Sequence, residues 1–317
     1  MMASFKAFTM WFAPQRLPLA NACLMACGAL GAISATVPVE WFLGMTDWRV
    51  LFAGLAAFSL VVALAVFLVV PDYREPPGHL RLRDQLRGLG QVFRDRFFWG
   101  IAPLGALSAG GSMAIIGLWA GPWLRDVAGL DRPAVATGLL IASAGMGAGF
   151  LAWGILTDRL ARLGLRPMTI AGGGMGLFTV VLLVMATGRI TETGLWILLA
   201  AVGFFASAGS LNYAIVSQHF PRDLAGRANT AHNVLVFVTA FIVQWGIGGI
   251  LRAWEDTTTH QYDPTGYQVA FVVVAVLQVA ALAWFLRQWL KRADTPLPGR
   301  ADRPGAAAFD IEAPTED

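Results

Sequence analysis

Long apolar stretches without charged residues are the feature that most limits what this chain can fold into. Each is about 20 residues long, the length that an α-helix needs to cross ~30 Å of hydrocarbon. The stretches are apolar on all sides of a helix, and they do not alternate as barrel strands do. The sequence therefore predicts an all-α polytopic membrane protein with eight spanning helices. The predicted spans are residues 19–43, 50–70, 98–120, 134–156, 167–187, 194–217, 230–251 and 267–289.

Basic residues in the connections between these spans predict how the chain is oriented. Lys and Arg concentrate in short loops on the cytoplasmic side of a membrane. Here they concentrate before the first span, in every second connection and after the last span, with the largest group in residues 71–97. The other connections contain only Arg49, Arg125, Arg132, Arg189 and Arg252. We therefore expect an integral protein of the plasma (bacterial inner) membrane with both termini in the cytoplasm.

A short internal similarity suggests how the spans are grouped. The segments "FAPQRLPLAN" (12–21) and "FPRDLAGRAN" (220–229) align without gaps, and six spans separate them. Repeats of six helices in parallel are a known plan of transporters, whereas the alternative is chance similarity between two loops of like composition. The repeat predicts four regions. They are the end of one helix and two further helices of a first bundle (1–70), a cytoplasmic linker (71–97), a complete six-helix bundle (98–292) and a disordered tail (293–317).

The linker has an amphipathic pattern of its own. Leu82, Leu86, Leu89, Phe93 and Phe97 recur at intervals of three or four, with arginines between them. This spacing places the apolar side chains on one face of a helix, which suits a helix lying on an anionic membrane surface. The alternative is a solvated linker.

The charged segment "GILTDRLAR" (154–162) resembles the G-x-L-x-D-R-x-G-R loop signature of the major facilitator superfamily, a large class of secondary transporters. The matching residues are Gly154, Leu156, Asp158, Arg159 and Arg162. Ala161 stands where the family prefers Gly. The resemblance implies the fold of that superfamily, with this segment between helices eight and nine of twelve. The chain would then correspond to helices five to twelve, that is, the complete C-terminal bundle and the last two helices of the N-terminal bundle.

The physical chemistry of Asp158 predicts a role in gating. Asp158 is predicted to end its helix at the membrane face. A carboxylate there is disfavoured by the dipole of its own helix, and it is stabilised by N–H groups at the start of another helix. We expect that helix to open at "GRANTA" (226–231), where Gly226 and Arg227 lie. Such a contact would form a cytoplasmic latch in one conformation only, and Gly154 would allow the close approach. The alternative is that Asp158 is a solvated acid.

Polar residues within the spans are the candidates for a substrate cavity, because burying them in a membrane is costly. We predict five neutral ones. They are Ser108, Ser112, Asn212, Tyr213 and Gln244. The alternative role for each is a hydrogen bond between helices. No ionisable residue lies near the middle of a predicted span, and Glu40 and His232 lie near the ends.

These observations favour transport of a small solute of unknown identity by alternating access, with or without a coupling ion. A membrane-embedded enzyme would need ionisable groups that converge at one depth, and the predicted spans lack them. The sequence also contains no P-loop, so we expect no ATP site.

We expect no cofactor and no metal, because Cys23 and Cys27 lack further ligands nearby. The net charge of +3 comes from loop arginines, so we expect contact with the lipid bilayer and no nucleic acid. The alternative function is an inactive fragment, or one part of a split transporter whose missing N-terminal helices are in another chain.

Overall fold

Helices make up nearly all of the part of the chain that the structure describes. The computed structural model describes residues 24, 27–28, 30–70, 82–188, 191–255 and 262–293. Seven helical segments in this part are long and apolar enough to cross a membrane. They are Trp48–Val69, Arg96–Asp126, Arg132–Arg162, Pro167–Thr187, Glu192–His219, Leu224–Trp254 and Pro264–Trp289. Seven of the eight predicted spans are thus confirmed. The remaining one is described only in part, as the shorter apolar helix Leu30–Leu43.

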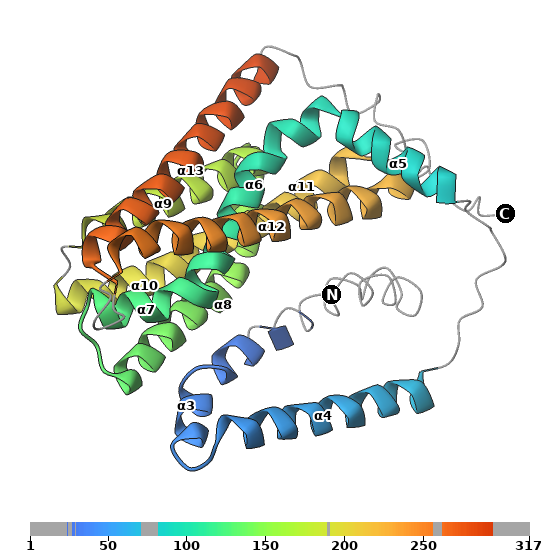
Figure 1. Ribbon diagram of the computed structural model, residues 1–317. Helices are drawn as coiled ribbons and strands as arrows, with labels where there is room; N and C mark the ends of the chain where they lie inside the picture. Colours follow the sequence, from blue (N-terminus) through green and yellow to red (C-terminus); the bar gives the residue numbers. More distant parts are fainter. Residues whose placement is uncertain are drawn as a thin grey trace, which may run out of the picture.

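Two predicted features lie outside the described residues. These are the helix end expected near the start of the chain and the disordered tail beyond residue 293. The first described elements are α3 (Val37–Leu43) and α4 (Trp48–Val69), which form a pair set apart from the other helices (Figure 1). A turn at residues 35–36 precedes α3, which has a proline in its first turn, as expected where a helix begins. No residue of α4 is buried.

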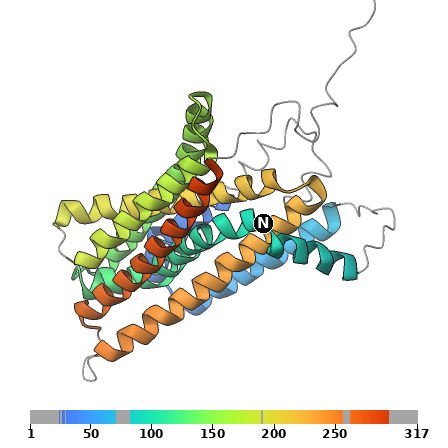
Figure 2. The same cartoon turned by 90° about the horizontal axis from the view of Figure 1, so that it is seen from above.

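The remaining helices pack into one bundle, whose elements follow in chain order. They are α5 (Leu82–Arg94), α6 (Arg96–Ala114), η2 (Ile115–Trp119), α7 (Ala120–Asp126), α8 (Arg132–Arg162), α9 (Pro167–Thr187), α10 (Glu192–Ala206), η3 (Ser207–Ser210), α11 (Leu211–His219), α12 (Arg222–Leu251), η4 (Arg252–Trp254) and α13 (Pro264–Ala293). The most extensive contacts pair α8 with α10, α6 with α12, and α9 with α13. Figure 2 shows α9 and α13 side by side. We call the end of the bundle that contains the starts of α8 and α13 the outer end, and the opposite end, predicted to be cytoplasmic, the inner end.

Glycines bring α8 and α10 into backbone contact. A Cβ atom on Gly203 of α10 would overlap the carbonyl oxygen of Ala142, and one on Gly145 of α8 would overlap that of Ala200. Gly149 lies in the same way against Phe204. Small residues of this kind let spanning helices approach closely, because van der Waals packing is a main attraction between helices in lipid. We infer that α8 and α10 form one rigid unit.

The core has two apolar layers. The outer cluster is formed by residues of η2, α7 and the outer halves of α9, α10, α12 and α13, including Trp123, Phe178, Tyr267 and Phe271. The inner cluster is formed near the inner end, around Phe98, Trp153, Met175 and Phe285. Residues of α3 and α4 belong to neither cluster. The buried polar residues of the bundle lie mostly near the boundary between the two clusters. They are Ser108, Ser112, Ser143, Thr179, Ser207, Asn212, His232 and Gln278.

Helix α8 begins and ends with recognisable caps. Asp131 precedes it and accepts a hydrogen bond from the backbone N–H of Ala134 at 2.9 Å. At the inner end Gly164 has φ +88°, and the N–H of Leu165 donates to the carbonyl of Leu160, which is a Schellman motif. The segment 154–162 is therefore helical, which corrects the prediction that Asp158 ends its helix. The predicted span stopped at residue 156 because only the apolar part of a helix marks the hydrocarbon.

The predicted amphipathic helix exists as α5. It packs against α12, and Val92 on it is fully buried in the inner cluster. The guanidinium group of Arg227 lies so close to Gly88 that a Cβ atom there would overlap it. One face of α5 is thus covered by the bundle, and contact of the other face with a membrane surface stays a prediction.

The outer end of α13 is held by polar contacts. The hydroxyl of Tyr267 donates to Oδ2 of Asp126 at 2.8 Å, and Nε of Arg125 lies 2.7 Å from the other oxygen of that carboxylate. The Asp126 side chain is only 1% exposed, so these partners are needed to offset its burial. Just before the helix, hydrogen bonds from the Thr265 side chain and from its backbone N–H lower the pKa of the Asp263 carboxyl below its usual value.

Candidate functional site

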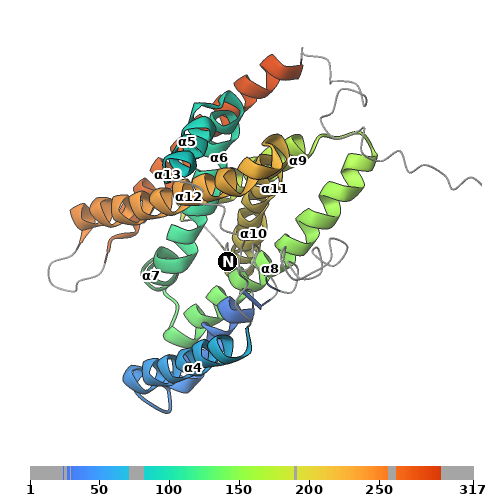
Figure 3. The same cartoon turned by 90° about the vertical axis from the view of Figure 1, so that its right-hand side faces the viewer.

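The predicted latch residues lie on two helices that the structure keeps apart. Asp158 is exposed on the last turns of α8, and its Oδ2 lies 2.7 Å from Nη2 of Arg162, one turn further along. In the part of the chain that the structure describes, Asp158 has no partner on α12, and Arg159 forms no ion pair. Apart from its own helix, no described atom lies within 4 Å of where a Cβ on Gly154 would be. Leu160 still packs on the inner cluster, so it is the face of α8 with Gly154 and Asp158 that is exposed, and Figure 3 shows the inner end of α8 projecting from the bundle.

The partner expected for Asp158 on α12 is placed differently. The prediction that a helix opens at Gly226 is wrong, because α12 already begins at Arg222 and Gly226 lies more than one turn inside it, where the backbone N–H groups are paired within the helix. Gly226 has open space around it among the described residues, while Arg227 lies against Gly88 of α5. The two halves of the predicted latch are thus separated in this conformation. A contact that forms in only one conformation is compatible with this separation, so the latch stays a prediction.

A polar junction at the inner end was not found from the sequence. Asp95 caps α6 by accepting the N–H of Phe98 at 2.8 Å, and its other oxygen lies 3.3 Å from Nε2 of His219. The ring of His219 stacks on that of Phe97 with 3.9 Å between the centroids. These contacts join the connection between α5 and α6 to the end of α11. A histidine in the last turn of a helix was the available signal, because that position favours a cation.

Two of the five predicted cavity residues lie in a buried polar cluster with His232. Asn212 and His232 are both fully buried, and both lie against Gly105 of α6, where a Cβ atom would overlap the Asn212 amide. The rings of Tyr213 and His232 meet in a T-shaped contact with 5.0 Å between the centroids, and the Tyr213 hydroxyl donates to Oδ1 of Asn233 at 2.8 Å. The structure thus brings Asn212 and Tyr213 of α11 together with α6 and α12.

Several polar atoms buried in the bundle have no hydrogen-bond partner among the described residues. They include Oγ of Ser108, Oδ1 of Asn212, both ring nitrogens of His232 and both amide atoms of Gln278. Leaving one such atom buried and unpaired costs about 1–3 kcal/mol. Polar groups kept at this cost inside a membrane protein are candidates for function.

The sequence missed His232 because α12 is longer than its apolar run. The predicted span began at residue 230, which placed His232 at a helix end. The helix actually begins at Arg222, so that His232 lies almost three turns inside it. The first turns of α12 contain charged and polar residues and were therefore not recognised as helical.

The other predicted cavity residues are placed differently. Ser108 is fully buried on α6 and lies near Gly209 of η3. Ser112 is also buried, and its hydroxyl donates to the carbonyl of Ala109 on the same helix at 2.8 Å. The backbone carbonyl of Gln244 accepts a hydrogen bond from the Trp119 indole at 3.2 Å. Only Tyr213 and Gln244 of the five are partly exposed.

We expect replacement of His232 by leucine to raise the stability of the protein. The substitution removes two unpaired nitrogens, which should raise the free energy of unfolding by about 1–3 kcal/mol. The matched control is Thr179→Val, which removes a buried hydroxyl that is already paired with the carbonyl of Met175, and which should change stability little. Thermal unfolding in detergent measures the stability of both variants. A fall in the Tm of His232→Leu would contradict the assignment of His232 as an unpaired group.

The arrangement suits non-covalent binding through hydrogen bonds. Within the residues that the structure describes, no group of three or more His, Cys, Asp or Glu residues is placed to hold a metal ion. The polar side chains found together are neutral hydroxyl, amide and imidazole groups, which donate and accept hydrogen bonds.

Comparison with known proteins adds independent observations. The family model of the Major Facilitator Superfamily matches residues 1–244. The hexuronate transporter of Escherichia coli strain K12 is 24% identical over 321 residues, which covers 90% of this chain and 68% of that protein. The hexuronate transporter of Escherichia coli O157:H7 matches to the same extent.

A solved structure has a similar fold. It is that of a bacterial homologue of the human lysosomal transporter Spinster, in an inward-facing and unoccupied conformation. The TM-score is 0.56 at 17% sequence identity, and the match covers 88% of this chain and 72% of the other. The likeness concerns the arrangement of the helices.

Proposed function

We propose that this chain, which belongs to the major facilitator superfamily, moves a small solute across a membrane by alternating access. Membership in this family makes it an integral membrane protein of solute transport. Alternating access requires two helical units that meet at one end and part at the other, and that exchange these ends during the cycle.

The observation that supports this proposal is the asymmetry of α8. Near its outer end α8 contacts α3, and Arg132 forms an ion pair with Glu40. Near its inner end Gly154 and Asp158 are exposed. In the part of the chain that the structure describes, α8 is therefore joined to the α3–α4 pair near its outer end and exposed near its inner end, as expected of a conformation that is open at the inner end.

The substrate class we propose is a small polar solute rich in hydroxyl groups. The support is the neutral hydrogen-bonding character of Ser108, Asn212 and Tyr213, which suits hydroxyl recognition, together with the hexuronate transport named for the relatives. Sugar acids are therefore the first compounds to test. A coupling ion is part of the proposal only if uptake responds to a proton or sodium gradient.

The latch between Asp158 and the start of α12 belongs to the same proposal. When the inner ends close, Asp158 exchanges Arg162 for Arg227 of α12. A hydrogen bond to a charged group is worth about 1.5–3 kcal/mol, which is enough to favour the closed inner end.

Uptake by purified protein in liposomes tests the proposal. We expect accumulation of a radiolabelled sugar acid, and we expect Asp158→Asn to slow it roughly tenfold or more, because a charged partner of the latch is lost. The matched control is Glu192→Gln, which removes an exposed carboxylate at the outer end of α10. Uptake by Asp158→Asn at the parent rate would contradict the latch. Absence of uptake for sugar acids, neutral sugars and other organic anions alike would contradict transport by this chain on its own and favour the need for a partner chain.

A further inference from the structure

The contact between the α3–α4 pair and the bundle is concentrated at the outer end. Among residues 30–70 Thr36 is the only buried one, and it directly precedes α3. Glu40 lies one turn after it. On α8, Ala136 is buried and lies one turn after Arg132, on the same side of the helix. Since α3 runs toward the outer end and α8 starts there, these two pairs of positions lie at matching heights.

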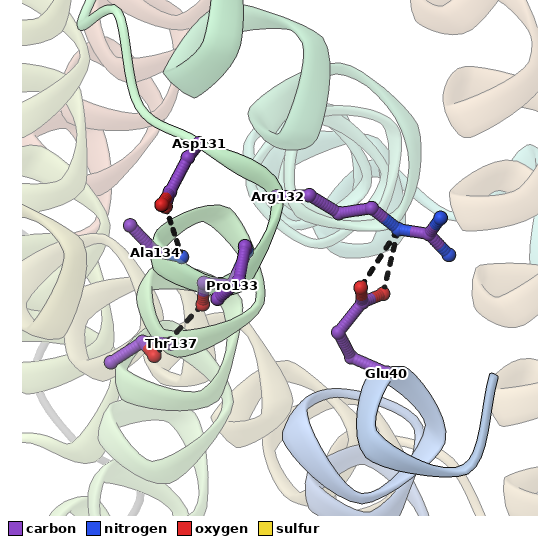
Figure 4. Close-up of polar contacts among 6 residues, drawn as sticks. All are labelled: Glu40, Asp131, Arg132, Pro133, Ala134 and Thr137. Atoms are coloured by element: carbon purple, nitrogen blue, oxygen red, sulfur yellow. Dashed lines mark hydrogen bonds and ion pairs between the residues drawn. The ribbon is translucent and has the colours of Figure 1, made fainter. Parts of the chain in front are cut away.

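An ion pair closes this contact at its outer edge. Nε of Arg132 lies 2.8 Å from Oε1 and 3.0 Å from Oε2 of Glu40 (Figure 4). The Glu40 side chain is 26% exposed and that of Arg132 is 70% exposed. Of the ion pairs in the described part of the chain, this one joins the α3–α4 pair to the bundle.

The position of Arg132 is not explained by its own helix. It is the first residue of α8, where the helix dipole disfavours a cation. Glu40, in contrast, lies in the first turn of α3, where the dipole favours an anion. Asp131 already caps α8 through the N–H of Ala134. The contact with Glu40 is therefore the interaction in this structure that accounts for a basic side chain at the start of α8.

We propose that Glu40 and Arg132 are positioning residues of the transport cycle, whose ion pair holds the outer ends of α3 and α8 together and must break before the outer end can open. This inference rests on the proposed function. The pair suits such a role because it is partly exposed, and exposed ion pairs contribute only about 0.2–1 kcal/mol. A contact of this strength biases the two conformations and still breaks in every cycle.

Labelling of an introduced cysteine tests the inference without a substrate. The reporter is Ala136→Cys, in a background with Cys23→Ser and Cys27→Ser, treated with a membrane-impermeant maleimide from either side of sealed vesicles. Breaking the pair with Glu40→Gln or Arg132→Gln should raise the labelling rate from the outer side about two- to fivefold. The reversed pair, Glu40→Arg with Arg132→Glu, should restore a rate close to that of the parent.

The matched control is Asp47→Asn. It removes another ion pair at the outer end, that of Asp47 with Arg49, which lies within the start of α4 and joins no two units. The labelling rate should stay at the parent value. If Ala136→Cys does not fold, Thr36→Cys serves as the reporter on the facing helix.

The outcomes separate this inference from the proposed function. Unchanged labelling in both single variants, or a reversed pair as accessible as the singles, would overturn the role of the ion pair even if solute uptake is retained. Labelling that responds as expected supports the role of the ion pair, and it does so also if no solute is taken up, in which case the transport proposal alone fails.

Discussion

Replacing Gly203 by leucine is expected to cost about 3 kcal/mol or more and to leave little monodisperse protein, because the added side chain has no space. A Cβ atom at this position already overlaps the carbonyl oxygen of Ala142 and would lie 2.8 Å from the backbone nitrogen of Met146. These neighbours are backbone atoms of α8, which cannot rotate away as a flexible side chain can. The strain is relieved only if α8 and α10 separate. Size-exclusion chromatography and thermal unfolding in detergent measure the loss.

The control for this prediction is Gly246→Leu on α12. No described atom lies within 4 Å of a Cβ atom there, and the residue is exposed. Leucine has a higher helix propensity than glycine, so the variant should be as stable as the parent or slightly more stable. Equal Tm values for Gly203→Leu and the parent would show that α8 and α10 are not held in backbone contact.

Replacing Trp153 by alanine is expected to lower the free energy of unfolding by about 3–5 kcal/mol, as for other large buried side chains. The Trp153 side chain joins three helices. Its ring lies against Gly174 of α9, and its indole N–H donates to the carbonyl of Phe204 on α10 at 2.9 Å. It is 5% exposed and belongs to the inner cluster. Thermal unfolding again provides the measurement.

Two further variants divide this effect into its parts. Trp153→Phe keeps most of the ring and removes the hydrogen bond, so it should cost about 1 kcal/mol from that bond, plus any loss of packing. Trp245→Ala is the matched control, because Trp245 is 70% exposed on α12 and its ring lies next to that of Phe241. It should change the stability little. Losses of equal size for Trp153→Ala and Trp245→Ala would contradict the placement of Trp153 in the core.

The sequence predicted helices best where both ends have a local signal. The predicted and observed bounds of α9 agree at residues 167 and 187, because Pro167 suits the first turn and Gly188 adopts φ +62° just after the last. The inner ends of α8 and α12 were missed for a common reason. Hydrophobicity marks the part of a helix inside the hydrocarbon, and these two helices continue past it with charged residues.

Contacts between helices could not be predicted in the same way. The motif around Asp158 indicated the family, which the family model confirms. Its present partner, Arg162, follows from the helical continuation of α8 that the sequence analysis did not foresee. The environment of His232 depends on Gly105 and Asn212, which lie far away along the chain. A single sequence gives the faces of helices but does not say which faces meet.

The length of α8 links this protein to the thickness of its membrane. With 31 residues α8 is about 46 Å long, whereas α9, with 21 residues, is about 32 Å long, close to the ~30 Å of a hydrocarbon core. A helix that exceeds the core must tilt or protrude, and each ångström of mismatch has a small energetic cost. Since the two ends of α8 contain Arg132 and Asp158, a change of tilt moves both. Lipids with longer or shorter acyl chains should therefore shift the balance between the two conformations without any change in the protein.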